Sequence, residues 1–181
     1  FLEYGGYVRK YDGELVVISP NTETFQPNLK EFEEKINEKT KAVIINTPNN
    51  PSGVVYSRET LENISDILEK KQKEFGTSIV LISDEPYREL VYDVTTDTPF
   101  PAKIYENTII CYSFSKSISL PGERIGYILV PNSVKESKAI FAAVCGAGRS
   151  LGFVCAPSLF QRVAAACINE KTDLTIYRTN R

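Results

Sequence analysis

The part of the sequence that most constrains the fold is a strand–helix–strand pattern between residues 41 and 83. Two short runs of mainly apolar, β-branched residues, 41–46 and 78–83, are typical of strands buried on both faces of a parallel sheet. Between them Ser57 can cap a helix that Gly76 ends, and its apolar residues recur at helical spacing: Leu61, Ile64, Ile67 and Leu68. This connection is long enough for a right-handed crossover, so the two strands should be parallel.

Two later apolar runs extend the sheet. Residues 108–113 predict a third strand and residues 125–130 a fourth. Roughly eleven residues separate these two runs, too few for a crossover helix, so the fourth strand should run antiparallel to the others. The sequence therefore predicts an α/β fold with a mostly parallel sheet.

The other patterns predict flanking elements. These are a strand at 14–18, a helix at 29–37 capped by Asn28, a helix opened by a capping box at 133–136 and broken at Gly146 and Gly148, a helix beginning at Pro157, and a last helix at about 173–181 capped by Asp173.

The composition excludes several kinds of chemistry. The chain has no histidine, so Ser/His/Asp and Cys/His triads and His-ligated metals are excluded within it. The four cysteines form no CxxC pair and lie in apolar settings, which favours reduced, buried thiols over a zinc site or a disulfide frame (Cys111, Cys145, Cys155 and Cys167). Lysine becomes the leading candidate nucleophile, and we expect no bound metal.

Charge and hydropathy suggest the surroundings of the protein. The net charge is -2, and no dense run of Lys and Arg is present, so nucleic acid is not an expected partner. No apolar stretch approaches the ~20 residues of a membrane span, and no signal peptide opens the chain. We expect a cytoplasmic protein with no membrane partner.

Polar side chains follow each predicted parallel strand. Ligands of open α/β sheets bind at the carboxyl edge of the parallel strands. The antiparallel fourth strand would begin at this same edge, which adds the residue before it. Six side chains should therefore converge on one crevice: Asn50, Asp84, Tyr87, Ser113, Lys116 and Arg124.

Half of this set suits a phosphorylated carbonyl compound. The amine of Lys116 can form a Schiff base with a carbonyl group. The hydroxyls of Ser113 and Ser115 and the guanidinium of Arg124 suit a phosphate dianion.

The other half suits an aromatic ring that carries a cation and an oxyanion. Asp84 would be a buried, unpaired carboxylate unless a cation lay beside it. A protonated ring nitrogen would supply that cation. Tyr87 and Asn50 can donate hydrogen bonds to a ring oxyanion. These groups occur together in pyridoxal 5'-phosphate, where Asp84 would keep the pyridine protonated and Lys116 would carry protons at the substrate Cα.

Four short motifs occur in a fixed order: NNPSG at 49–53, DEPY at 84–87, SFSK at 113–116 and GERIGY at 122–127. They resemble the NNP[TS]G, DExY, SxSK and GxRIGY motifs of the aspartate-aminotransferase-like, fold type I pyridoxal-phosphate enzymes of class I/II. The resemblance spans the whole chain and implies a three-layer α/β/α large domain. It also implies residue roles: Lys116 as the Schiff-base lysine, Asp84 at the pyridinium, Asn50 and Tyr87 at the ring oxygen, Ser113, Ser115 and Arg124 at the phosphate, and Phe1 stacked on the ring.

The resemblance also sets expectations for the whole protein. Residues 1–181 would be part of the pyridoxal-phosphate-binding large domain, with the N-terminal arm and the C-terminal small domain outside the chain. The last helix would lead toward that small domain. The full-length protein would be a homodimer that acts on an amino acid and a 2-oxo acid, and this chain alone would be inactive.

Several alternatives remain at this stage. The same motifs serve C–S β-lyases of this fold, and a non-catalytic regulator module can keep the cofactor lysine. An inert fragment is a third possibility. Residues 113–116 also match the SxxK motif of penicillin-recognising proteins, but the chain lacks the SDN and KTG motifs that should follow it.

Overall fold

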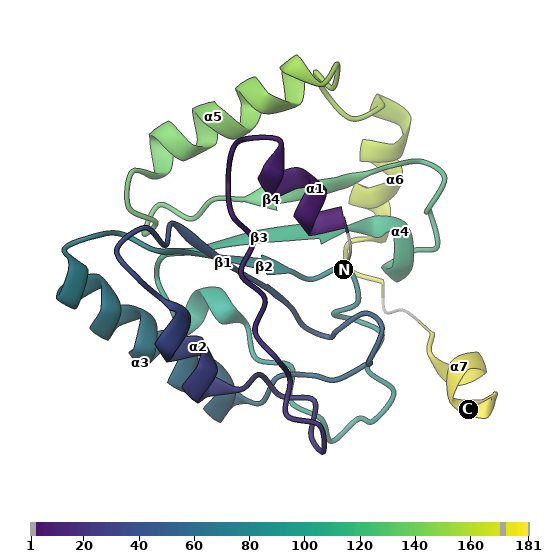
Figure 1. The fold of residues 1–181 in the computed structure, drawn as a ribbon. Helices are drawn as coiled ribbons and strands as arrows, with labels where there is room; N and C mark the ends of the chain where they lie inside the picture. The colour runs from purple at the N-terminus through teal and green to yellow at the C-terminus, as the bar shows by residue number, and fades with distance from the viewer. Residues whose placement is uncertain (1–2, 171–172, 181) are drawn as a thin grey trace.

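The computed structural model describes residues 3–170 and 173–180 and contains a four-stranded sheet in the order β1-β2-β3-β4 (Figure 1). The strands are β1 (Ala42–Asn46), β2 (Val80–Asp84), β3 (Thr108–Ser113) and β4 (Gly126–Leu129). The pairs β1–β2 and β2–β3 are parallel, and β3–β4 is antiparallel. The predicted α/β class and the antiparallel fourth strand are confirmed.

Helices lie on both sides of this sheet. α2 and α3 lie on one side, and α1 and α5 lie on the other (Figure 1). The helices are α1 (Glu3–Arg9), α2 (Leu29–Lys35), α3 (Arg58–Phe75), the 3-10 helix η1 (Pro101–Lys103), α4 (Phe114–Ser117), α5 (Ser137–Ser150), α6 (Ser158–Cys167) and α7 (Thr175–Thr179). None of the helices in the described ranges is long and apolar enough to cross a membrane.

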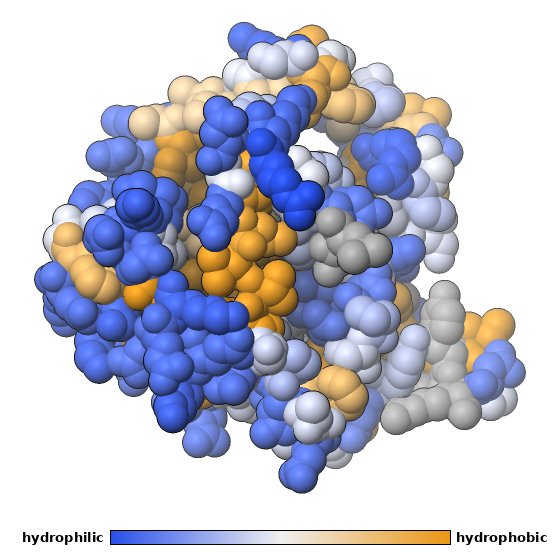
Figure 2. Space-filling view, in the orientation of Figure 1, coloured by the Kyte–Doolittle hydropathy of each residue, from blue (hydrophilic) through white to orange (hydrophobic). Residues whose placement is uncertain are grey.

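The main hydrophobic core lies between the sheet and the α2–α3 layer. Buried side chains from both helices pack there against strand residues: Phe32, Leu61, Ile64 and Leu68 from the helices, and Ile45 and Leu81 from the strands. The opposite layer is more open, since α5 has no buried residue among those described and all four residues of β4 are exposed. Figure 2 accordingly shows hydrophobic residues at the surface in the middle of one face.

The two ends of α3 follow the sequence prediction. Ser57 Oγ accepts a hydrogen bond from the backbone N–H of Thr60 at 3.0 Å, and the helix ends at Gly76 with φ of 64°. A residue with a side chain is strained in that left-handed conformation, so glycine suits the position. These local signals define the crossover between β1 and β2.

We expect Ser57→Ala to lower the free energy of unfolding by about 1 kcal/mol, because one N–H at the start of α3 loses its capping acceptor. Urea denaturation of the variant and the wild type measures the difference. Ser52→Ala, in the exposed turn before the helix, is the control and should cost less. Equal losses from the two substitutions would contradict a specific capping role.

Residues 14–18 are not a strand, so this prediction was wrong. Leu15, Val16 and Val17 are exposed, and the sheet begins at β1 without pairing to them. A strand is stable only when a neighbour takes up its backbone hydrogen bonds, and the described residues offer none at this position.

Two further local predictions were wrong. α5 begins at Ser137, because Ser133 Oγ donates to Glu106 O and Lys135 N donates to Asn107 Oδ1, which fixes residues 133–136 as a turn. The helix also continues through Gly146 and Gly148 to Ser150. Glycine weakens a helix by only about 1 kcal/mol, so it does not by itself end one.

The cysteine prediction was correct in one respect only. All four thiols are free, but Cys145 and Cys155 are exposed, and Cys111 and Cys167 are partly buried. Both exposed cysteines lie in the open part of the fold around α5 and α6.

Candidate active site

The sheet registers bring the predicted site residues to one edge. Asn46 pairs with Asp84 across β1 and β2, and Asp84 pairs with Cys111 across β2 and β3. Ser113 pairs with Gly126 at the start of β4. All the predicted site residues except Phe1 therefore lie at or next to the strand ends at this edge, with Asp84 and Ser113 as the last residues of β2 and β3. Phe1 lies outside the described residues.

Asn50, Tyr87 and Lys116 form a group at this edge. Asn50 Nδ2 donates to the Tyr87 hydroxyl at 3.0 Å. The Lys116 Nζ lies 5.9 Å from the centroid of the Tyr87 ring, within cation–π range. Lys116 is exposed, whereas Asn50 and Tyr87 are partly buried. The structure thus places an accessible amine next to a fixed amide–phenol pair.

The two serines of the SFSK motif lie together beside Lys116. Ser113 Oγ donates to Ser115 Oγ at 2.8 Å and accepts from the Ser115 backbone N–H at 3.1 Å. Ser113 thereby caps the short helix α4, which carries Lys116. Both hydroxyls are partly buried at the point where β3 ends.

Arg124 is near this group through its backbone, but its guanidinium bonds elsewhere. Gly126 lets β4 approach closely, because a Cβ there would lie 2.3 Å from the Tyr112 carbonyl oxygen. Arg124, two residues before it, is exposed with φ of 51° and donates from Nη1 to Pro121 O within its own turn. Its side chain makes no hydrogen bond to Ser113 in the described part of the chain.

Asp84 has a partner that the sequence did not reveal. The hydroxyl of Tyr4, on α1, donates to Asp84 Oδ2 at 2.5 Å. Burial, and then the hydrogen bond to the Asp84 carboxylate, raise the pKa of Tyr4 well above its usual value. Tyr4 therefore stays protonated and acts as a donor. Residues 1–11 are merely aromatic-rich in sequence, so only the position of α1 identifies Tyr4.

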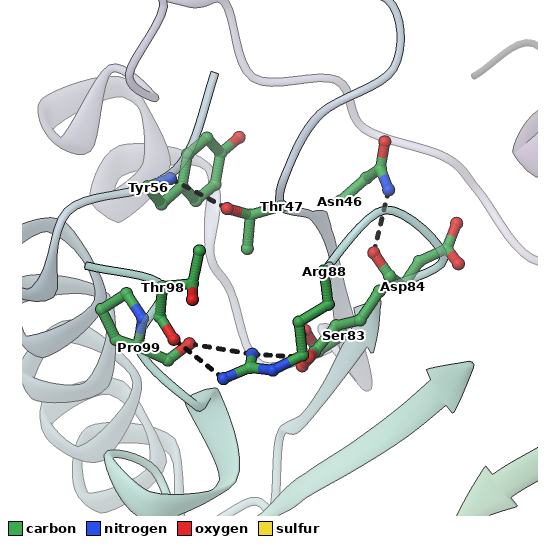
Figure 3. Close-up of polar contacts among 9 residues, drawn as sticks. Asn46, Thr47, Tyr56, Ser83, Asp84, Arg88, Thr98 and Pro99 are labelled. Atoms are coloured by element: carbon green, nitrogen blue, oxygen red, sulfur yellow. Dashed lines mark hydrogen bonds and ion pairs between the residues drawn. The ribbon is translucent and has the colours of Figure 1, made fainter. Parts of the chain in front are cut away.

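A buried ion pair lies next to Asp84, on the other side of the strand. Glu85 is 1% exposed; it accepts from Ser83 Oγ at 2.8 Å and from Arg88 Nη1 at 2.9 Å. Arg88 also donates to the carbonyls of Thr98 at 2.8 Å and Pro99 at 3.3 Å (Figure 3). Burial raises the pKa of Glu85, while the Ser83 hydrogen bond and the Arg88 charge oppose this shift.

No group of three or more metal-ligating side chains occurs among the residues that the structure describes. The model for the family described as aminotransferase class I and II matches residues 1–178. The chain belongs to this family.

Individual relatives agree with the family assignment. An aspartate aminotransferase from Pyrococcus horikoshii is 37% identical over 123 residues, covering 67% of this chain and 30% of that protein. An aromatic-amino-acid aminotransferase from Thermococcus litoralis is 32% identical over 144 residues, covering 78% of this chain and 36% of that protein. The crystal structure of an amino transferase from Eubacterium rectale superposes with a TM-score of 0.94 at 54% identity, covering 99% of this chain and 45% of that one.

The aminotransferase family assignment confirms the fold that the four motifs implied. The chain spans less than half the length of the three aminotransferases it was compared with, between 30% and 45%. The sheet is mostly parallel with one antiparallel pair, as predicted. Tyr4, Ser83, Glu85 and Arg88 are additions that the motifs did not identify as interacting residues.

Proposed function

We propose that the protein containing this chain is a pyridoxal-phosphate-dependent aminotransferase that moves an amino group between an amino acid and a 2-oxo acid. The observation that carries this proposal is the grouping of Asn50, Tyr87 and Lys116 at the same sheet edge as Asp84. Membership of the class I and II family and the aminotransferase names of the relatives support it.

The donor set fits pyridoxal phosphate. Lys116 would hold the cofactor covalently, and the Asn50–Tyr87 pair would face its ring oxygen. The hydroxyls of Ser113 and Ser115 would bind the phosphate. Bound there, the cofactor supplies an electron sink for the negative charge that develops at the substrate Cα.

Arg124 would join the phosphate site only after its guanidinium leaves Pro121 O. A bidentate contact between the guanidinium and a phosphate dianion is stronger than a single hydrogen bond from the guanidinium to an uncharged carbonyl, so the exchange is favourable when the anion is present. Because Arg124 is exposed, its side chain has room for this rotation.

Asp84 and Lys116 would have separate roles in the reaction. The Tyr4 hydroxyl donates to the Asp84 carboxylate, which would pair with the protonated pyridine nitrogen of the cofactor. Lys116 would remove and return the proton at the substrate Cα, as a general base and then a general acid.

We further propose that the full-length protein is a cytoplasmic homodimer in which this chain forms part of the cofactor-binding large domain. The four free thiols are consistent with a reducing compartment. On this proposal α7 leads toward the small domain, Phe1 stacks on the cofactor ring, and the chain alone is inactive. Sedimentation of the full-length protein tests the homodimer, and a comparison of its activity with that of residues 1–181 tests whether the chain alone is inactive.

Spectroscopy of the full-length protein tests the proposed reaction. After loading with pyridoxal phosphate, the visible absorbance of the cofactor should be lost when aspartate or an aromatic amino acid is added, and a 2-oxo acid should restore it. Aspartate and aromatic amino acids are natural first substrates, since relatives carry both names. Release of pyruvate and a thiol from a cysteine conjugate, without this reversal, would instead identify a C–S β-lyase. Cofactor binding with no turnover would favour the regulator module.

A further inference from the structure

We propose that Asn46 is a positioning residue that sets the relative placement of Asp84 and Asn50. This inference rests on the proposed function and adds a residue to the same site. Asn46 is the last residue of β1, and only 8% of it is exposed. Its side chain bonds the backbone of both residues, so one buried amide links the two sides of the candidate cofactor site.

The two hydrogen bonds use opposite ends of the Asn46 amide. Asn46 Nδ2 donates to Asp84 O at 2.9 Å (Figure 3), and Asn46 Oδ1 accepts from the Asn50 backbone N–H at 2.7 Å. A carbonyl oxygen accepts only, and a backbone N–H donates only, so the orientation of the amide is fixed by its partners. A side chain of the same size without both groups cannot make both bonds.

The hydrogen bond from Asn46 to Asp84 O helps to hold the peptide group between Asp84 and Glu85 in place. The carbonyl of Asp84 is held by Asn46, and the next N–H, that of Glu85, donates to Cys111 O at 2.9 Å. Both polar groups of the peptide between Asp84 and Glu85 are therefore bonded, to β1 on one side and to β3 on the other. The backbone at Asp84 is held where its carboxylate meets the Tyr4 hydroxyl.

The bond to Asn50 fixes the turn that carries the ring-oxygen contacts. Asn50 N is bonded to the Asn46 side chain, and Asn49 Nδ2 donates to Asn46 O at 3.3 Å. The Asn50 side chain in turn donates to Tyr87 OH. Asn46 therefore links Asp84, the carboxylate expected at the nitrogen of the cofactor ring, with the Asn50–Tyr87 pair expected at the ring oxygen. The ring nitrogen and the ring oxygen lie at different positions of the same small ring.

Thr47 offers a matched control for the loss of stability that follows from removing a buried hydrogen-bonding side chain. It follows Asn46, is 5% exposed, and its Oγ1 accepts from the Tyr56 backbone N–H at 2.8 Å (Figure 3). None of the hydrogen bonds among the described residues joins it to Asp84 or Asn50. Asn46→Val and Thr47→Val place the same apolar side chain at two neighbouring buried positions, and both leave a backbone N–H without its side-chain acceptor.

The test compares both variants in the full-length protein, cleared of cofactor and titrated with pyridoxal phosphate. We expect both substitutions to lower the thermal midpoint. Only Asn46→Val should weaken cofactor binding, by about tenfold, the factor that one to two lost hydrogen bonds represent. It should also shift the pH dependence of the bound cofactor's visible absorbance, because Asp84 would no longer be held against the ring nitrogen.

Cofactor affinity and absorbance in Asn46→Val that match the wild type would overturn the inference, and so would equal weakening by Thr47→Val. If Asn46→Val does not fold, Asn46→Ser replaces it, since serine is smaller, stays polar and reaches neither partner in the same way. A wild-type protein that binds pyridoxal phosphate but transfers no amino group would overturn the proposed function alone. A wild-type protein that binds no cofactor would overturn both.

Discussion

Replacing Lys116 with alanine is expected to slow amino transfer by the full-length protein by about 10³-fold or more, the scale of a lost general acid–base group. The physical reason is that Lys116 offers an accessible amine beside Tyr87 at the proposed cofactor site. The rate of cofactor conversion in a single turnover with saturating amino acid measures the loss, independently of product release.

A second variant separates the amine from its charge, and a third is the control. Lys116→Arg keeps a cationic side chain at this position but cannot accept a proton from the substrate, because the guanidinium does not deprotonate in proteins. It should therefore lose as much activity as the alanine variant. Lys103→Ala removes an exposed lysine of η1 and should leave the rate unchanged. A Lys116→Arg variant with the wild-type rate would contradict the assignment of Lys116.

Replacing Arg88 with alanine is expected to lower the free energy of unfolding by about 3 kcal/mol, because it leaves the Glu85 carboxylate buried without its cation. The substitution also removes two donors from the carbonyls of Thr98 and Pro99. Urea denaturation at pH 8 measures the loss. Arg58→Ala is the control: Arg58 bonds Asp97 of the same loop at 3.3 Å, but both side chains are exposed, so the cost should be at most about 1 kcal/mol.

The pH dependence of this loss identifies its cause. Burial already raises the pKa of Glu85, and removal of Arg88 takes away one of the influences that lower it. A carboxyl whose pKa is raised by folding binds its proton more tightly in the folded state, so stability falls as pH rises through the interval from its unfolded to its folded pKa. The cost of Arg88→Ala should therefore shrink as the pH is lowered toward the usual carboxyl range.

Glu85→Gln in the Arg88→Ala background provides the second check. The neutral amide keeps a polar group for Ser83 and removes the buried charge, so the double variant should be more stable at pH 8 than the sum of the two single changes predicts. Strict additivity, or a cost that does not vary with pH, would show that the lost bonds to the loop carbonyls account for the whole effect.

The sequence predicted the parts of this fold that depend on local patterns. The β-branched runs, the Ser57 cap and Gly76 specify β1, α3 and β2 from nearby residues alone. The short span between β3 and β4 was enough to predict an antiparallel pair. Residues 14–18 were wrongly predicted because strand formation depends on a distant neighbour, which a local pattern does not reveal.

The same distinction holds at the site. Residues that follow strands could be placed at one edge by topology, as for Asn50, Asp84 and Lys116. The partners of those residues could not, since Tyr4 lies 80 positions from Asp84 in the sequence and meets it only through the packing of α1. The direction of a long side chain is equally inaccessible from sequence, as the bond from Arg124 to Pro121 shows.

The alternation of side chains at the end of β2 has a consequence for engineering. Asp84 faces Tyr4 on α1, whereas Ser83 and Glu85 point to the opposite side and hold the loop through Arg88. The loop is held by Arg88 through the backbone carbonyls of Thr98 and Pro99, and its side-chain ion pair, from Asp97 to Arg58, is exposed. Residues 94–97 should therefore tolerate replacement or lengthening while the proposed cofactor site stays intact, which makes this loop a suitable place to graft a foreign peptide.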